Sequence, residues 1–140
     1  MKIEDIFCSE EQSVRLKELG IVQESLFYYT DSKWGIMPKK SIDFSGNPRS
    51  AFTIGELGFL LPKKIRKDRM DFTYRVNLNK SGNWEYKYRT RCNRQKGIYK
   101  SIPLILVTNK SEAQARADIL IFLLENGHIT AEFCNNIIKE

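Results

Sequence analysis

The sequence predicts an α+β fold with a mainly antiparallel sheet packed by helices on one face. Three observations support this prediction. Three segments begin with a helix-capping signature, residues 71–91 alternate between apolar and polar side chains, and the longest apolar run, 119–124, falls inside a helical pattern. The 140 residues show no repeat, no low-complexity segment and no break in composition. Residues 1–140 are therefore expected to form one compact domain.

The capping signature has the form S/T-x-x-E/Q. The hydroxyl accepts a hydrogen bond from the backbone N–H three residues on, and the Glu or Gln side chain reaches back to the N–H of the cap residue. The signature occurs at 9–12, 53–56 and 111–114. It predicts helices over 10–19, 54–61 and 112–126.

The ends of these helices are also marked. Gly20 and Gly127 supply left-handed stops for the first and third helices, and Pro62 ends the second. A short fourth helix, 131–138, is expected to begin at Thr130.

The helix over 112–126 has an unusual distribution of apolar residues. One stripe consists of Ala113, Ala117, Leu120, Ile121 and Leu124. Three further apolar residues, at 119, 122 and 123, make its C-terminal half apolar nearly all round. Such a helix is either buried centrally or contacts a partner, and central burial is the simpler interpretation. The apolar run 119–124 is too short to cross a bilayer, so no membrane span is expected.

Several segments are expected to be strands or loops. Residues 24–29 and 33–37 flank a turn-rich tripeptide and predict a hairpin. Residues 43–50 are typical of a loop. Residues 103–107 form a further strand candidate, apolar enough to lie in the interior.

The clearest strand signal is the hairpin over 71–91, which alternates with period two on both arms. If Leu78 lies opposite Trp84, the alternation pairs Val76 with Tyr86 and Tyr74 with Tyr88. These apolar and aromatic residues then share one face, which is interpreted as core. The same register puts Arg75 opposite Lys87 and Thr73 opposite Arg89 on the other face. Because like charges directly opposite are mildly destabilising, the pair would be accounted for by an anion between them or by long side chains that splay into water.

The charge of the chain is segregated. The net charge is +6, but residues 39–100 hold 16 Lys and Arg against 5 Asp and Glu. Within them, the predicted loop 63–69 carries five cations in seven residues. This pattern indicates an anionic partner or a well-solvated surface. The residues expected to bind nucleic acid or another anion are Lys63, Lys64, Arg66, Lys67, Arg75, Lys87 and Arg89.

The preferred interpretation is a non-enzymatic interaction module whose basic middle segment, 39–100, contacts an acidic partner. That partner is nucleic acid bound through its phosphates, or a protein with an acidic surface. In the alternative, the apolar C-terminal half of helix 112–126 contacts a protein. An enzyme with an unrecognised site is the third choice. The oligomeric state is left open.

Residues with metal-binding or catalytic chemistry are few. Cys8, Cys92 and Cys134 are far apart and odd in number, and His128 is the only histidine. The expectation is three reduced thiols, no metal site, no disulfide and no cofactor. His128 follows the predicted end of helix 112–126, where a histidine commonly interacts with helix carbonyls. The N-terminus has acids where a signal peptide has its apolar stretch, so a cytoplasmic location is expected.

Several stretches of the sequence resemble a known family. They are 9–12 leading to 16–20, 27–29, 51–53 with 56–58 and 61–62, and 112–117 with 123–127. In these the chain resembles a family of small proteins of uncharacterised function encoded by gut anaerobes and by their phages and integrated elements. The resemblance covers both ends of the chain but covers residues 63–100 poorly. It implies a compact, cytoplasmic α+β domain of mobile-element origin, and it assigns no activity and no functional residues.

Overall fold

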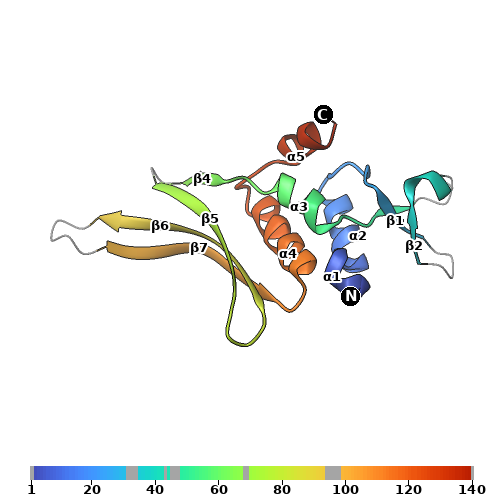
Figure 1. The fold of residues 1–140 in the computed structure, drawn as a ribbon. Helices are drawn as coiled ribbons and strands as arrows, with labels where there is room; N and C mark the ends of the chain where they lie inside the picture. Colours follow the sequence, from blue (N-terminus) through green and yellow to red (C-terminus); the bar gives the residue numbers. More distant parts are fainter. Residues whose placement is uncertain are drawn as a thin grey trace.

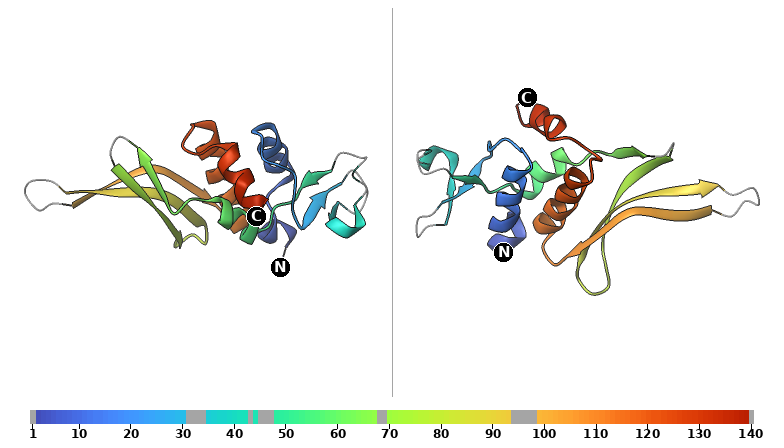
Figure 2. Two further views of the ribbon diagram at one scale, coloured as in Figure 1. Left: turned by 90° about the horizontal axis from the view of Figure 1, so that it is seen from above. Right: turned by 180° about the vertical axis from the view of Figure 1, so that it is seen from behind.

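Helix α4, Glu112–Glu125, runs through the middle of the molecule, and the other elements lie on either side of it (Figure 1). A four-stranded sheet lies on one side, and helices α1 (Ile3–Ile6) and α2 (Glu10–Glu18) with a three-stranded sheet lie on the other (Figures 1 and 2). Helix α3 (Ile54–Leu60) packs against α4 itself. This computed structural model describes residues 2–30, 35–42, 44, 48–67, 70–93 and 99–139. Both sheets are antiparallel, which confirms the predicted α+β class.

The four-stranded sheet has the order β4-β5-β6-β7. Its strands are β4 (Lys64–Lys67), β5 (Met70–Leu78), β6 (Trp84–Asn93) and β7 (Tyr99–Asn109). The predicted register of the central hairpin is confirmed, with Leu78 opposite Trp84 and Arg75 opposite Lys87. The hairpin turn is closed by a 2.9 Å hydrogen bond from Asn79 N–H to the carbonyl of Asn83.

Strand β4 corrects the prediction of a loop at 63–69 over residues 64–67, and residues 68 and 69 lie outside the described residues. Ile65 is buried and lies opposite the buried Phe72 of β5, so a single apolar side chain anchors a segment that is otherwise cationic. Local sequence does not reveal this pairing, because three of the four residues of β4 are cations. Strand β7 is also longer than the predicted 103–107, and a β-bulge interrupts its pairing with β6 beside Tyr88.

The three-stranded sheet has the order β2-β1-β3. Strand β1 (Phe27–Tyr29) pairs with β2 (Ile36–Pro38), which confirms the predicted hairpin, and residues 31–34 between them lie outside the described residues. A 3-10 helix, η1 (Lys39–Ser41), follows. Strand β3 (Arg49–Ser50) also pairs with β1 and corrects the C-terminal end of the predicted loop 43–50. Of that loop, residues 43 and 45–47 lie outside the described residues.

The predicted helices are present with nearly the predicted bounds. They are α2 (Glu10–Glu18), α3 (Ile54–Leu60), α4 and α5 (Ala131–Ile138), and a short unpredicted helix, α1 (Ile3–Ile6), precedes them. Ser9 with Gln12 and Thr53 with Glu56 form complete capping boxes. Gly20 and Gly127 adopt the expected positive φ, at 95° and 71°.

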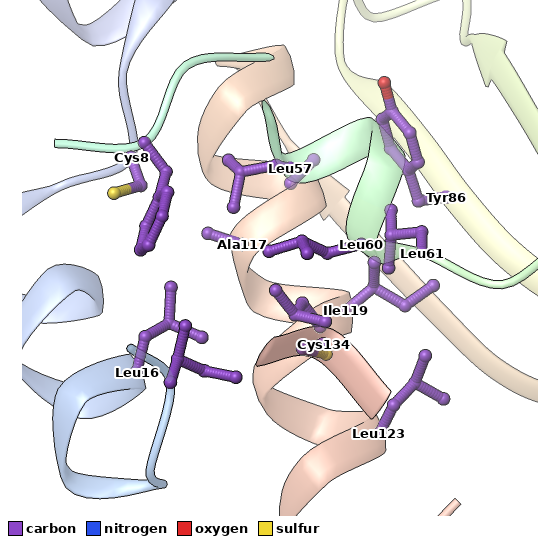
Figure 3. Close-up of a cluster of buried hydrophobic side chains, with 14 of the residues drawn as sticks. Cys8, Leu16, Leu57, Leu60, Leu61, Tyr86, Ala117, Ile119, Leu123 and Cys134 are labelled. Carbon is purple, nitrogen blue, oxygen red and sulfur yellow. The ribbon is translucent and has the colours of Figure 1, made fainter. Parts of the chain in front are cut away.

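Helix α4 is buried centrally, as its apolar pattern predicted. Ala115, Ala117, Ile119, Leu120 and Leu123 are fully buried and join one core cluster with side chains from α2, α3 and β6 (Figure 3). The helix packs on two sides, so its buried surface is wider than the predicted stripe, whose Ile121 and Leu124 are only partly buried. In the described part of the chain, no helix is both long enough and apolar enough to cross a membrane.

The guanidinium of Arg116 joins α4 to α3 and to β6. Its Nε donates to the hydroxyl of Tyr86, its Nη1 to the carbonyl of Ile54 and its Nη2 to Oε1 of Glu112, each at 2.9 Å. The Tyr86 hydroxyl donates to the same Glu112 oxygen at 2.7 Å. A β-carbon on Gly58 of α3 would collide with Nη1, so a larger residue at this position would have to displace the hydrogen-bonded guanidinium.

The other side of α4 is held by Gln12 of α2. Its Nε2 donates to the carbonyl of Gln114 at 2.9 Å and to Oδ1 of Asp118 at 2.5 Å. Its Oε1 accepts from the N–H of Ser9, which completes the cap of α2. One side chain therefore both caps its own helix and fixes that helix against α4.

The central position of α4 predicts a large loss of stability when one of its buried side chains is truncated. Replacing Leu120 with Ala should lower the free energy of unfolding by about 2–5 kcal/mol, because a fully buried side chain leaves a cavity. The same truncation of Leu78, which is 56% exposed, should cost less than about 1 kcal/mol. Urea unfolding of both variants checks the difference, and equal costs would contradict this account of the core.

The close approach of Gly58 and Arg116 predicts that Gly58→Ala has opposite effects on stability in the native protein and in an Arg116→Ala variant. Alanine is better than glycine in a helix by about 1 kcal/mol. Even so, Gly58→Ala should destabilise the protein by about 1–3 kcal/mol, because the new methyl displaces a hydrogen-bonded guanidinium. In an Arg116→Ala background the same change should be neutral or stabilising. Denaturant unfolding of the four proteins measures the cycle, and an equal cost in both backgrounds would rule out this contact as the cause.

Candidate functional site

Five of the seven predicted anion-binding residues lie on one face of the four-stranded sheet, which we call the outer face. Tyr86 and Tyr88 of β6 point to α4 and the core, so alternation turns their neighbours Lys87 and Arg89 to the opposite face. Arg75 of β5 lies opposite Lys87, and Lys64 of β4 lies opposite Thr73, which in turn lies opposite Arg89. Arg66 shares the face of Lys64, two residues along β4. The pairing of three strands thus brings these five cations together.

The other two predicted residues do not lie on the outer face. Lys67 alternates with Lys64 and Arg66 and so shares the face of the buried Ile65. Its charge contributes to lowering the pKa of His128, after the larger effect of burial, which places Lys67 near the C-terminal end of α4. Lys63 precedes β4 and is exposed beside the strand.

Two carboxylates lie among the five cations, and each has a partner. Asp71 is 3.4 Å from Arg66 in an ion pair that is well exposed on both sides, so it contributes little to stability. Glu85 accepts hydrogen bonds from the side chains of Asn79 and Asn77 and lies 4.0 Å from Lys87. The hydrogen bonds from Asn79 and Asn77 lower the pKa of Glu85, so it stays ionised. The outer face as described remains positive.

The described aromatic residues of β5 and β6 are on the inner side of the sheet, as the alternation predicted. Tyr86 and Tyr88 are fully buried, and their hydroxyls donate to Glu112 at 2.7 Å and to the carbonyl of Pro62 at 2.6 Å. Trp84 is partly buried against the core. Base stacking therefore has no platform among the described residues of the outer face, whose contacts with a polyanion would be ionic.

The exposure of two residues on the inner face of the sheet differs from the prediction. Val76 and Leu78 share the face of the buried tyrosines, yet they are 42% and 56% exposed. The turn end of the β5–β6 hairpin projects beyond α4 (Figure 1), so no helix covers these two side chains. Alternation predicts which way a side chain points but not where the covering helix stops.

A pocket of about 460 Å³, not anticipated from the sequence, lies between α3, α5 and the segment before β1. It is lined by Leu26, Phe59, Leu60, Ile137 and Ile138, with Phe59 78% exposed. The sequence feature that could have revealed this pocket is Phe59, an apolar residue of α3 that lies outside the helix face formed by the buried Leu57 and Leu60.

Two carboxylates, Glu24 and Glu56, line this pocket, and that of Glu56 is hydrogen-bonded to the backbone. Glu56 accepts from the N–H of Leu26 at 3.0 Å and from the N–H of Thr53 at 3.2 Å, one bond to each oxygen. Both oxygens therefore support local structure, and this carboxylate is a poor candidate for a general base.

The histidine and the two described thiols are in apolar surroundings. His128 stacks on Phe122 with ring centroids 5.9 Å apart, and burial lowers its pKa. Burial raises the pKa of the Cys8 thiol to about 12 and that of Cys134 to about 11, so both stay protonated and unreactive at neutral pH. The side chain of Cys92 lies outside the described part of the chain. Among the residues that the structure describes, no three metal-ligating side chains gather into a site.

No family model, no curated protein and no solved structure matches this chain. The function is therefore inferred from the placement of its own residues.

The buried thiols and phenols predict a loss of stability in alkali. The thiols of Cys8 and Cys134 and the phenol of Tyr29 have raised pKa values in the folded protein, against ordinary values of 9.0 and 10.0. As pH rises past 9, the unfolded chain releases these protons first, so unfolding becomes more favourable up to about pH 12. The melting temperature should therefore fall steadily above pH 9.

Thermal unfolding between pH 7 and pH 11 tests this prediction. In a Cys8→Ala, Cys134→Ala variant the fall should begin nearer pH 10, where the phenols of the unfolded chain ionise. An unchanged melting temperature from pH 8 to pH 11 would show that these groups are not buried in the way described.

Proposed function

We propose that the protein is a non-enzymatic interaction module that binds a polyanion, in the first instance nucleic acid, through the outer face of its four-stranded sheet. One observation carries the proposal: Lys64, Arg66, Arg75, Lys87 and Arg89 come from three adjacent strands and share one face. A cytoplasmic location and a mobile-element origin are part of the same proposal.

The geometry of the sheet suits contact with a phosphate backbone. Neighbouring strands are about 4.8 Å apart and alternate residues along a strand about 6.8 Å apart, so the cations form a regular grid. Long Lys and Arg side chains on such a grid can reach successive phosphates. Because no aromatic side chain accompanies them on the described face, we expect binding that depends on charge and is independent of base sequence.

The electrostatics of Arg75 and Lys87 support the proposal further. The two residues lie directly opposite each other in the register, where like charges are mildly destabilising. Lys87 is only 20% exposed at its side chain, so solvent screens it less than a free surface lysine, while its 4.0 Å ion pair with Glu85 offsets part of the repulsion. A bound phosphate would relieve this repulsion.

An acidic protein bound through the same face is the second candidate, since its carboxylates would meet the same cations. The other alternative, a protein partner on the apolar half of α4, has lost support, because Ile119, Leu120 and Leu123 are buried inside the domain. An enzymatic function has no support from the occupied carboxylate of Glu56 or from the protonated thiols.

We expect labelled duplex and single-stranded oligonucleotides to bind, as measured by fluorescence anisotropy at low salt. The affinity for duplex should fall by about 0.9 log unit per log unit of salt for each phosphate neutralised. Arg75→Glu with Lys87→Glu should weaken binding to all sequences equally. Its melting temperature should fall only modestly, because the partly exposed pair of Lys87 with Glu85 is replaced by repulsion, and circular dichroism checks that the variant is folded.

A matched control separates the outer face from overall charge. Lys40 and Lys139 are exposed and lie on η1 and after α5, away from the four-stranded sheet. Reversing both to Glu lowers the net charge as much as the first variant does, yet affinity should stay close to that of the native protein. Equal losses in both variants would show that only net charge matters. No binding at tens of micromolar protein in about 50 mM salt would rule out nucleic acid and leave an acidic protein as the partner to test.

A further inference from the structure

Strand β7 leaves one edge of the four-stranded sheet open. It is the outermost strand of the order β4-β5-β6-β7 and is 11 residues long. Within the described chain, no further backbone hydrogen bond reaches residues 104–108 from outside the sheet. These residues, Leu-Ile-Leu-Val-Thr, carry no charge, and Leu106 is 53% exposed. An open, uncharged and apolar edge is a template for another strand.

The register shows which backbone groups face this edge. Asn79 N–H bonds to Asn83 at the hairpin turn, so in the alternating ladder the backbone groups of Lys87 point to β5. Leu106 lies opposite Lys87, and its N–H and C=O therefore point away from β6. The same alternation turns the backbone groups of Thr108 outward.

The position of Pro103 is consistent with this assignment of the backbone groups that face the open edge of β7. It lies opposite Arg89, whose backbone groups also point to β5, so the N–H that proline lacks would have fallen on the open edge. Proline is tolerated in a sheet at such positions. Together with the β-bulge beside Tyr88, in which Leu104 has no partner on β6, it limits the regular open edge to residues 105–108.

We propose that β7 pairs with β7 of a second copy of this chain, antiparallel and with the two-fold axis at Leu106. In that register Leu106 lies opposite its own counterpart and Ile105 lies opposite Val107, within the part of β7 that follows the bulge. Each apposition is apolar or uncharged, and the N–H and C=O of Leu106 are satisfied on both copies. The strand is therefore complementary to itself.

The positive outer face does not oppose this pairing. Lys87 is one strand removed from the edge, so its counterpart in the second copy lies three strand spacings away, about 14 Å. That separation exceeds the Debye length of about 8 Å at physiological salt, and the repulsion is largely screened. The proposal does not depend on polyanion binding, and its test needs no nucleic acid.

Sedimentation velocity from micromolar to millimolar chain concentrations is the measurement. The native protein should move from the 16.4 kDa monomer towards twice that mass as concentration rises. Leu106→Lys places two like charges at the two-fold axis and should remain monomeric at all concentrations. Leu78→Lys is a matched control, with a leucine of similar exposure on β5 away from this edge, and should dimerise like the native protein.

The register is tested by mixing two variants. Leu106→Lys and Leu106→Glu should each be monomeric alone, but an equimolar mixture should recover the dimer mass, because residue 106 faces only residue 106 of the other copy. Circular dichroism of each variant checks that it is folded. A native protein that stays monomeric at millimolar concentration, or a Leu106→Lys variant that dimerises normally, would overturn the proposal. A mixture that stays monomeric would overturn the register at Leu106.

Discussion

The guanidinium of Arg116 fixes the relation between the four-stranded sheet and the rest of the molecule. It bonds to the Tyr86 hydroxyl on β6, the Ile54 carbonyl at the start of α3 and the Glu112 carboxylate on its own helix. A partly buried charge is costly unless it is paired and hydrogen-bonded, and here the charge is paired with Glu112 and each of its three nitrogens donates a hydrogen bond. Because Tyr86 is held against α4, its neighbour Lys87 must face outward. The orientation of the outer face therefore follows from this junction.

On its other side, α4 is fixed by polar contacts that bring distant parts of the chain together. Gln12 near the N-terminus bonds to Asp118, and the second oxygen of Asp118 accepts from Asn109 at the end of β7 at 3.3 Å. The hydroxyl of Ser13 donates to the carbonyl of Ser50 in β3 at 2.6 Å. Helix α4 thus lies between two polar junctions, with the apolar core around it. This explains why a helix that is apolar nearly all round has little surface left for a partner.

Features set by neighbouring residues could be predicted from the sequence, and features set by distant ones could not. The helix caps and the register of the 71–91 hairpin depend on local spacing, and that spacing is enough to predict a common face for Arg75, Lys87 and Arg89. Strand β4 instead depends on Ile65 meeting Phe72, and this pairing brings Lys64 and Arg66 to the same face and turns Lys67 away from it. The exposure of Val76, Leu78 and Phe59 depends on where covering helices end, which no local pattern encodes.

The sheet is covered by α4 on one face, and no described element of the chain covers its other face or pairs with the β7 edge. Solubility alone would account for charge on an open face, but a mixture of signs meets that need with less repulsion. Here only two carboxylates, Asp71 and Glu85, lie among the five cations, and Arg75 lies directly opposite Lys87, so positive charge is in excess. The β7 edge is instead uncharged over five consecutive residues, 104–108, where natural sheets commonly place a charge. A cationic face and an apolar edge on one sheet are both unfavourable for an isolated domain, and each is relieved by a different partner: an anion over the face and a strand along the edge.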